Sequence, residues 1–296
     1  MGMMALPLVV GVDGSDSSLE AVDWAVDEAA RHELPLRLIH ASRWERYEGR
    51  LPSFGTNRSA GEIVAENIVA SCMQRATSRN PEVKVSAEAL AEDAVSALLQ
   101  EGREAFAVVT GSRGRGELAD TLLGSVSLAV AARSLSPAIV VRGAERNRQG
   151  AFGRVVLAVG DVAEGSAAIR FAFREARARD AELHAVRTWR RPAHSHGSQS
   201  LLIHEATTLI YEEQAATVLH EVLDEVEREE GEKTVCHREV IEGPAHRVLQ
   251  DVSEQADLLV VGSLHRRDRS GLQLGRVSHA VLHRAACPVA VVPQRV

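Results

Sequence analysis

Short, mostly apolar runs recur along the first half of the chain and predict strands. Five such runs are present, at residues 8–12, 36–41, 83–87, 107–110 and 138–141. Four of them are typical of strands buried on both faces of a parallel sheet, and the run at 83–87 alternates more weakly between apolar and polar residues. The first half therefore predicts five strands.

Between these runs, apolar residues return every three or four positions, which is the spacing of one face of a helix. The spacing predicts helices at 21–29, 63–76, 94–99 and 126–132. Ser17 followed by Glu20 has the form of a capping box, which places the start of the first helix near Ser17. Strands separated by helices imply right-handed crossovers, and hence an open parallel sheet with helices on both faces.

The second half of the chain repeats the first in the same order. Residues 8–13 (LVVGVD) correspond to 155–160 (VVLAVG), and 136–141 (SPAIVV) to 287–292 (CPVAVV). We therefore expect two tandem α/β domains, at residues 1–146 and 152–296, with a longer second helix around 201–230 in the second copy. The polar segment 143–153 is expected to join them as a loop.

Composition narrows the class of protein. The chain has 296 residues, 45% hydrophobic and only 3% aromatic, so its core must be aliphatic. A formal net charge of −7 argues against nonspecific nucleic-acid binding. Three distant cysteines and the absence of an 18-residue apolar run favour a cytoplasmic protein that binds no membrane.

A glycine-rich segment after the fourth predicted strand has two explanations: the glycines only build a loop, or they let the backbone approach an anionic ligand. Gly111 ends the strand, Gly114 leaves the backbone N–H groups open to approach, and Gly124-Ser125 begins the next helix. The free N–H groups and the positive dipole end of that helix favour phosphate, and Arg113 adds positive charge. The P-loop pattern of nucleoside triphosphatases is absent from the sequence.

The spacing Gly111-x2-Gly114-x9-Gly124-Ser125 resembles the nucleotide-binding signature of the universal stress protein family, Gly-2x-Gly-9x-Gly-Ser/Thr. Residues 9–15 (VVGVDGS) are also similar to the opening strand of that family, and the resemblance covers both halves of the chain. The sequence thus looks like a tandem universal stress protein of the actinobacterial type.

The resemblance implies a sheet order of 3-2-1-4-5 in each domain and ATP as the ligand, with Mg²⁺ as the usual partner of its phosphates. Asp13 and the end of the second strand would meet the adenosine, and the glycine-rich segment would meet the ribose and phosphates. The implied nucleotide-binding residues are Asp13, Ile39, Ala41, Gly111, Arg113, Gly114, Gly124, Ser125 and Val126.

The second copy departs from this pattern. A histidine stands in place of the second glycine, an arginine in place of the serine, and the aspartate is displaced by one residue. The candidate second site comprises Asp161, Gly262, His265, Gly275 and Arg276. We expect weak or no binding there, with direct pairing of Arg276 to phosphate as the alternative.

No catalytic constellation stands out. The pairs His194/His196 and His279/His283 lack the further ligand or the glutamate that a catalytic metal site needs. The resemblance therefore favours a nucleotide-dependent regulatory protein that is not an enzyme, with a homodimer and pseudo-symmetric domain packing expected. An assembly scaffold in which nucleotide is incidental and a slow ATPase are the alternatives.

Overall fold

The computed structural model describes residues 5–43, 60–114, 123–160, 166–190, 201–230, 234–265 and 274–295. These residues form two compact units that divide between Arg142 and Gly143. The predicted domain boundaries, at residues 146 and 152, stay a prediction.

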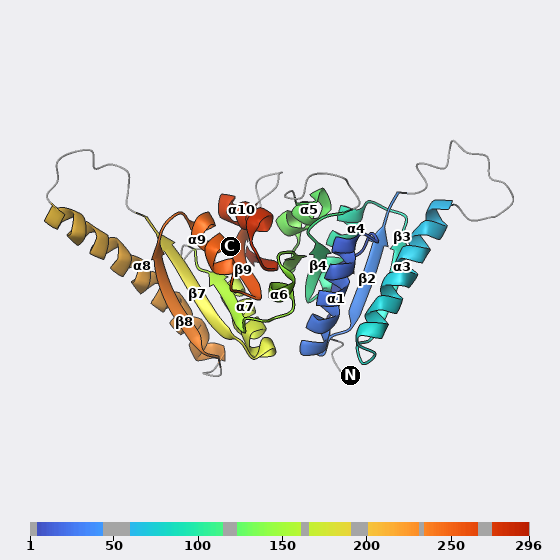
Figure 1. Cartoon of the computed structure of the whole chain (residues 1–296), viewed down its shortest axis with the longest axis horizontal. Helices are drawn as coiled ribbons and strands as arrows, with labels where there is room; N and C mark the ends of the chain where they lie inside the picture. The colour runs from blue at the N-terminus through green and yellow to red at the C-terminus, as the bar shows by residue number, and fades with distance from the viewer. Residues whose placement is uncertain are drawn as a thin grey trace. The chain divides into compact units, whose positions relative to one another are not determined.

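The first unit alternates strands and helices along the chain (Figure 1). Its strands are β1 (Leu8–Gly11), β2 (Leu36–Ala41), β3 (Val85–Leu90), β4 (Ala107–Gly111) and β5 (Ala138–Val141). Its helices are α1 (Asp16–Arg31), α3 (Ala60–Arg79), α4 (Ala94–Glu101), the 3₁₀ helix η1 (Gly102–Glu104) and α5 (Ser125–Arg133).

The strands of this unit lie in the order β3-β2-β1-β4-β5, and every pair is parallel. The predicted order 3-2-1-4-5 is therefore confirmed. The centre of the core is aliphatic, because Leu8, Val9 and Val10 of β1 are fully buried between the helical layers. Consecutive buried residues on a central strand are what coverage of both faces requires.

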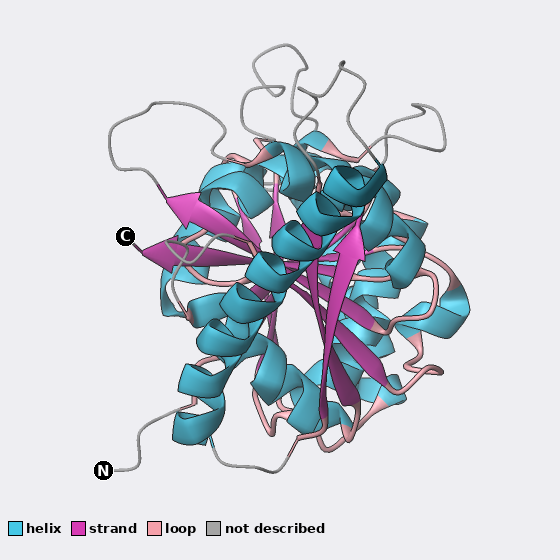
Figure 2. Cartoon of the chain, turned by 90° about the vertical axis from the view of Figure 1, so that its left-hand side faces the viewer, coloured by secondary structure: helices cyan, strands magenta, loops and turns pink. Residues whose placement is uncertain are grey.

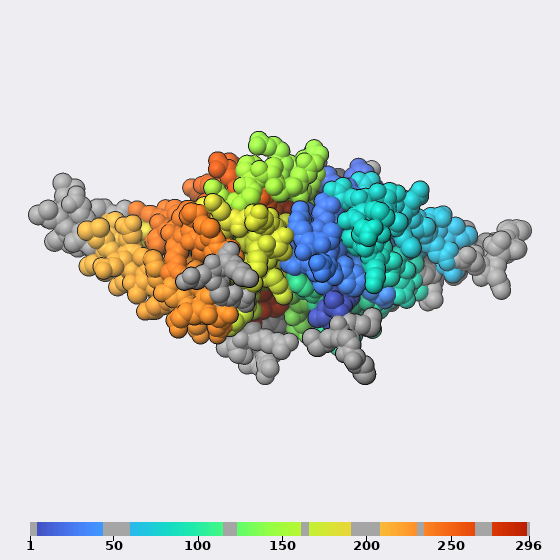
Figure 3. All heavy atoms as spheres, turned by 90° about the horizontal axis from the view of Figure 1, so that it is seen from below, coloured from blue at the N-terminus to red at the C-terminus, as the bar shows by residue number. Residues whose placement is uncertain are grey.

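Helices α1 and α3 lie side by side on one face of the first sheet (Figures 1 and 3, blue and cyan). Two bidentate ion pairs join their exposed sides, Arg75 with Asp23 and Arg79 with Asp27, at 2.6–2.8 Å. Exposed pairs of this kind contribute little stability, so the aliphatic contacts between helix and sheet dominate.

The second unit repeats the plan. Its strands are β6 (Arg154–Ala158), β7 (Glu182–Trp189), β8 (Cys236–Glu242), β9 (Leu258–His265) and β10 (Val289–Arg295). Its helices are α6 (Glu145–Arg148), α7 (Ala167–Arg179), α8 (Leu201–Glu230), α9 (Ala245–Ser253) and α10 (Arg276–Arg284).

The parallel strands of the second unit lie in the order β8-β7-β6-β9-β10, which is again 3-2-1-4-5. The long helix α8 lies across β7 and β8, as Figure 2 shows from that side. Its predicted extent, 201–230, is confirmed.

The segment 143–153 is more than the loop that its polar sequence suggests, because it contains α6. The buried side-chain amide of Asn147 donates to the carbonyl oxygens of Ser253, Glu254 and Ala256 at 2.8–3.2 Å. These three oxygens lie where α9 ends and lack partners within the helix, so Asn147 fastens the segment to the second unit.

Candidate ligand pocket of the first unit

A pocket of about 500 Å³ lies at the carboxyl ends of β1, β2 and β4 and the N-terminus of α5. This edge is where open parallel sheets hold ligands. The residues that line it are Gly11, Val12, Asp13, Ser18, Ile39, Ala41, Ala94, Leu98, Thr110, Gly111, Arg113, Gly114, Leu123, Gly124, Ser125, Val126, Ser127 and Leu128. All nine residues of the predicted first site are among them.

The turn after β1 fixes the Asp13 carboxylate. Its Oδ1 accepts hydrogen bonds from the Ser15 backbone N–H at 3.0 Å and the Ser15 hydroxyl at 2.6 Å. Gly14 has φ 78°, so the turn uses the left-handed region that glycine tolerates. Because these bonds occupy one carboxylate oxygen, Oδ2 is the atom that remains to face the pocket.

Gly114 lies directly against that carboxylate. A Cβ added to Gly114 would lie 2.8 Å from Asp13 Oδ2, closer than a carbon atom can come. The absence of a side chain at Gly114 therefore lets the loop after β4 close on the turn after β1. The sequence pattern, which treats the two segments separately, does not show this contact.

Ser17 joins the same two segments, a role that the sequence did not predict. The helix α1 begins at Asp16, and its N-cap is Ser15, whose hydroxyl accepts from the Ser18 N–H at 3.3 Å. The capping box predicted at Ser17 is therefore wrong. Ser17 Oγ instead accepts a hydrogen bond from the Arg113 N–H at 3.1 Å.

The N-terminus of α5 supplies the anion-binding geometry. Gly124 is its N-cap, makes no side-chain capping bond, and donates its N–H to the Ser112 carbonyl at 2.9 Å. The hydroxyl-bearing Ser125, which is exposed, opens the helix at the pocket. A helix start of this form places N–H groups and a positive dipole end toward the ligand space.

Apolar side chains form the opposite wall. Val12 and Ile39 are buried at the ends of β1 and β2, and Leu98 of α4 faces them. A Cβ on Gly11 would come within 2.8 Å of the Leu98 side chain, so this glycine lets α4 approach β1. Leu98 was not predicted as a site residue, and its helical position alone gives no signal for it.

Charged groups at the pocket are few. Among the described lining residues, Asp13 carries the negative charge and the exposed Arg113 the positive charge. The pocket thus has an aliphatic wall, a fixed carboxylate and a helix N-terminus on three sides. Arg115, the second arginine of the glycine-rich segment, lies outside the described residues.

The corresponding region of the second unit has a different backbone. Strand β4 ends at Gly111, whereas β9 continues past Gly262 to His265 and pairs with β10 throughout. The expectation that His265 occupies the place of Gly114 in a matching loop is therefore wrong. The residue that aligns with the glycine lies in a strand.

The other residues of the candidate second site are only partly brought together. Gly275 is the N-cap of α10 and Arg276 is its first residue, and both are exposed. Arg187 donates a hydrogen bond to the carbonyl of Gly160, the residue that corresponds to Asp13. Asp161 lies outside the described residues, as do His194 and His196.

The fold and the pocket together define a tandem open-sheet α/β protein whose first unit has a small-molecule pocket with a helix N-terminus at its edge. The family model of the universal stress proteins matches residues 4–142 and again residues 151–293. The chain therefore belongs to the universal stress protein family and contains the family's domain twice.

Relatives and solved structures agree with this assignment. A universal stress protein of Mycobacterium tuberculosis H37Rv is 31% identical over 310 residues, covering 97% of each chain. One of Mycolicibacterium smegmatis is 29% identical over 301 residues, with the same coverage. The crystal structure of a universal stress protein from Archaeoglobus fulgidus covers 98% of this chain and 99% of its own, with a TM-score of 0.68 and 18% identity, and shares the fold.

Among the described helices, none has the length and apolar character that a membrane crossing requires.

Proposed function

We propose that this protein is a nucleotide-dependent regulator of the stress response that binds ATP in the pocket of its first unit. The observation that carries the proposal is the convergence of nine residues, predicted from separate parts of the sequence, on one pocket of about 500 Å³. A pocket of this size falls in the range that small-molecule ligands occupy.

The wall formed by Val12, Ile39 and Leu98 suits the apolar faces of adenine. The free oxygen of Asp13 suits a ribose hydroxyl or an adenine amine, because a carboxylate accepts hydrogen bonds from both. These contacts would recognise the adenosine part of the ligand. They do not select the number of phosphates, which would lie at the N-terminus of α5.

The phosphates are assigned to Gly114, Gly124 and Ser125. The N-cap of α5 is Gly124, and the dipole of the helix favours negative charge at that end. The small residues Gly114 and Gly124 let the loop after β4 pack closely beside this helix end. Mg²⁺ would be held mainly by the phosphates and water, because it keeps much of its hydration shell.

We assign no catalytic role to the pocket. Asp13 is the carboxylate among the described lining residues, and Ser15 holds one of its oxygens. Slow ATP hydrolysis is the alternative that the same pocket allows. We further expect a cytoplasmic homodimer whose second unit binds nucleotide weakly or not at all.

The first experiment is to purify the full chain without added nucleotide, denature it, and identify the released small molecules by mass spectrometry. We expect about one adenine nucleotide per chain. The test variant is Gly124→Glu, which places a carboxylate at the α5 N-terminus and should lower ATP affinity by roughly 100-fold or more through charge repulsion and steric exclusion.

The matched control is Gly275→Glu at the α10 N-terminus, where a Cβ would meet no atom of the described residues within 4 Å. Under the proposal this variant keeps its nucleotide. Loss of nucleotide from both variants would contradict the assignment to the first unit. No nucleotide in the wild-type chain, and no binding when ATP is added, would leave the scaffold alternative.

A further inference from the structure

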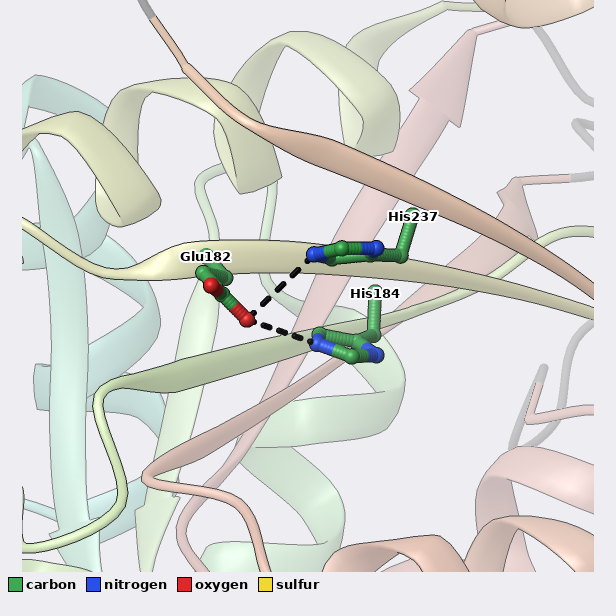
Figure 4. Close-up of side chains that lie close together, drawn as sticks. All are labelled: Glu182, His184 and His237. Atoms are coloured by element: carbon green, nitrogen blue, oxygen red, sulfur yellow. Dashed lines mark hydrogen bonds and ion pairs between the residues drawn. The ribbon is translucent and has the colours of Figure 1, made fainter.

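Three side chains of the second unit converge on one point between β7 and β8 (Figure 4). His184 Nε2 and His237 Nε2 lie 3.4 Å and 3.3 Å from the same Glu182 carboxylate oxygen. The three atoms lie within 4.8 Å of one another, and the two imidazole rings have centroids 4.6 Å apart. No local sequence pattern indicates this cluster, because its residues come from two strands that are distant in the sequence.

The strand register explains why they meet. His184 and His237 are directly paired across β7 and β8, and Glu182 precedes His184 by two residues on the same face of the sheet. Paired residues on neighbouring strands have their side chains close together. The arrangement is therefore built on two strands of regular geometry.

The first unit has different side chains at the corresponding position of its second strand. Arg37, at the place in β2 that His184 holds in β7, binds Glu88 of β3 and Glu101 of α4 at 2.7 Å each. That cluster is a complete ion network, since one guanidinium satisfies two carboxylates. In the second unit two imidazoles take the place of the guanidinium, so the Glu182 carboxylate faces two imidazole nitrogens, an atom type that commonly binds metal ions.

A second carboxylate orients the buried histidine. Glu239 Oε1 lies 2.9 Å from His184 Nδ1, so this ring nitrogen donates its proton to Glu239. In a neutral imidazole whose proton is on Nδ1, the nitrogen able to bind a metal ion is Nε2, which faces Glu182 and His237. A carboxylate behind a histidine is the usual outer-shell partner of a metal-binding imidazole.

We propose that Glu182, His184 and His237 bind a divalent transition metal ion such as Zn²⁺. Zinc bonds to nitrogen and oxygen are about 2.0–2.2 Å, so ligand atoms around a tetrahedral ion lie about 3.3–3.5 Å apart. The separations of 3.3 Å and 3.4 Å agree with that spacing. Three protein ligands leave a fourth position for water or another donor.

The donor set also selects the kind of ion. Imidazole nitrogen suits Zn²⁺, Cu²⁺ and Ni²⁺, whereas Ca²⁺ and Mg²⁺ prefer oxygen ligands. His184 is buried and its position is fixed by packing, while Glu182 and His237 are about half exposed, which gives an ion access from solvent. This site lies at the amino ends of the strands, the edge opposite to the one that holds ligands in open sheets.

The test uses the full chain without an affinity tag, after removal of metal with a chelator and without nucleotide. Zn²⁺ uptake is measured by equilibrium dialysis with elemental analysis, for the wild type and for His237→Ala and Glu182→Gln. We expect the wild type to bind about one Zn²⁺ per chain more tightly than either variant, by at least ~10-fold. Glu239→Gln, which acts through His184, should weaken binding by roughly 10-fold while leaving one ion per chain at saturation.

The matched control is His220→Ala, since His220 is an exposed histidine on α8. It should keep wild-type affinity. Substituting Co²⁺ gives an independent signature, because its visible absorption reports nitrogen and oxygen coordination and should disappear in His237→Ala.

Equal Zn²⁺ affinity in the wild type, His237→Ala and Glu182→Gln would overturn the proposal. The proposal would also be overturned if a variant lacking both His194 and His196 lost Zn²⁺ uptake while His237→Ala retained it. Because the assay contains no nucleotide, failure here leaves the ATP pocket untouched, and failure of the ATP pocket leaves the metal site untouched.

Discussion

The two units share one order of strands and helices and differ at most of the residues that we assign to the ligand. Both sheets have the order 3-2-1-4-5, and both place a helix with an N-cap glycine after the fourth strand. Yet β4 ends at Gly111, and the residues that follow it line the pocket, while β9 continues to His265. The shared fold therefore determines the apolar pattern and the order of the strands, whereas the pocket depends on the residue at which the fourth strand ends.

The difference extends to the far edge of the sheets. In the first unit Arg37 neutralises two carboxylates, and in the second His184 takes its place beside His237. Among the described residues, the two units therefore present different side chains at both edges of their sheets. We expect the units to respond to different ligands, adenine nucleotide in the first and a transition metal ion in the second.

The largest expected effect concerns Gly111, the last residue of β4, and its counterpart Gly262 within β9. A Cβ on Gly111 would lie 2.5 Å from the Ser17 carbonyl oxygen, which is backbone and cannot move without displacing α1. We expect Gly111→Ala to lower the free energy of unfolding of the first unit by about 3 kcal/mol, as overpacking does. Denaturant unfolding, followed by a probe in each unit, measures it.

The counterpart is Gly262→Ala, where the nearest atom is the Gln294 side-chain nitrogen at 2.4 Å. Because the end of a side chain can rotate away, the cost should stay below about 1 kcal/mol. Equal losses in the two variants would show that the loop after β4 is no more tightly packed than β9.

A smaller effect is expected at the turn after β1. Asp13→Ala removes the carboxylate that we assign to adenosine and should weaken ATP binding by about 10-fold, or ~1.4 kcal/mol, which is the size of one hydrogen bond to a charged group. Calorimetric titration of ATP into the full chain measures the change. Gly160→Ala, at the matching exposed position of the second unit, should bind as the wild type does; unchanged affinity in Asp13→Ala would remove Asp13 from the site.

The smallest expected effect concerns the caps of the equivalent helices α4 and α9. Asp93 caps α4 by accepting from the Ser96 N–H and hydroxyl at 3.1 Å each, while the N-cap of α9 is Pro244, which makes no side-chain capping bond. The Ser96 N–H is the main cause of the lowered Asp93 pKa. Asp93→Ala should therefore cost about 1 kcal/mol at neutral pH.

The pH dependence of that cost follows from the direction of the shift. A carboxylate with a pKa below its unfolded value adds stability above the unfolded pKa of about 4, and loses it as the pH falls through the folded value. Unfolding midpoints of wild type and Asp93→Ala should thus converge in acid. Pro244→Ala should show no such convergence, and a cost for Asp93→Ala that is the same at every pH would exclude the ionised cap.

Much of the fold was predictable because buried parallel strands are short, apolar and easily counted. The strand order needed the family resemblance, since periodicity alone does not say which strands are neighbours. The third strand was placed about two residues early, at 83–87 against Val85–Leu90, because its alternation is weak. The helix α6 was missed, since what fixes it is a contact between Asn147 and α9 that no local pattern contains.

The candidate site was predictable as far as it rests on glycine spacing. The nine predicted residues line one pocket because two loops at the same sheet edge must converge. Ser17 and Leu98 were not found, because their roles arise from side chains of neighbouring helices that meet the loops only after folding. The greater length of β9 was also not predicted. Aligning His265 with Gly114 assumes that the fourth strand ends at the same point in both halves of the chain.

One hydrogen bond is present in both units and separates two kinds of requirement. Ser127 Oγ donates to the Gly111 carbonyl at 2.7 Å, and Ser278 Oγ to the Gly262 carbonyl at 3.4 Å. The bond is present in the second unit although β9 continues beyond Gly262, so it holds a helix against the fourth strand of each unit and does not depend on a ligand. In a duplicated chain each half can therefore be compared with the other. We attribute an interaction that both halves share to folding, and one that a single half has to the ligand of that half.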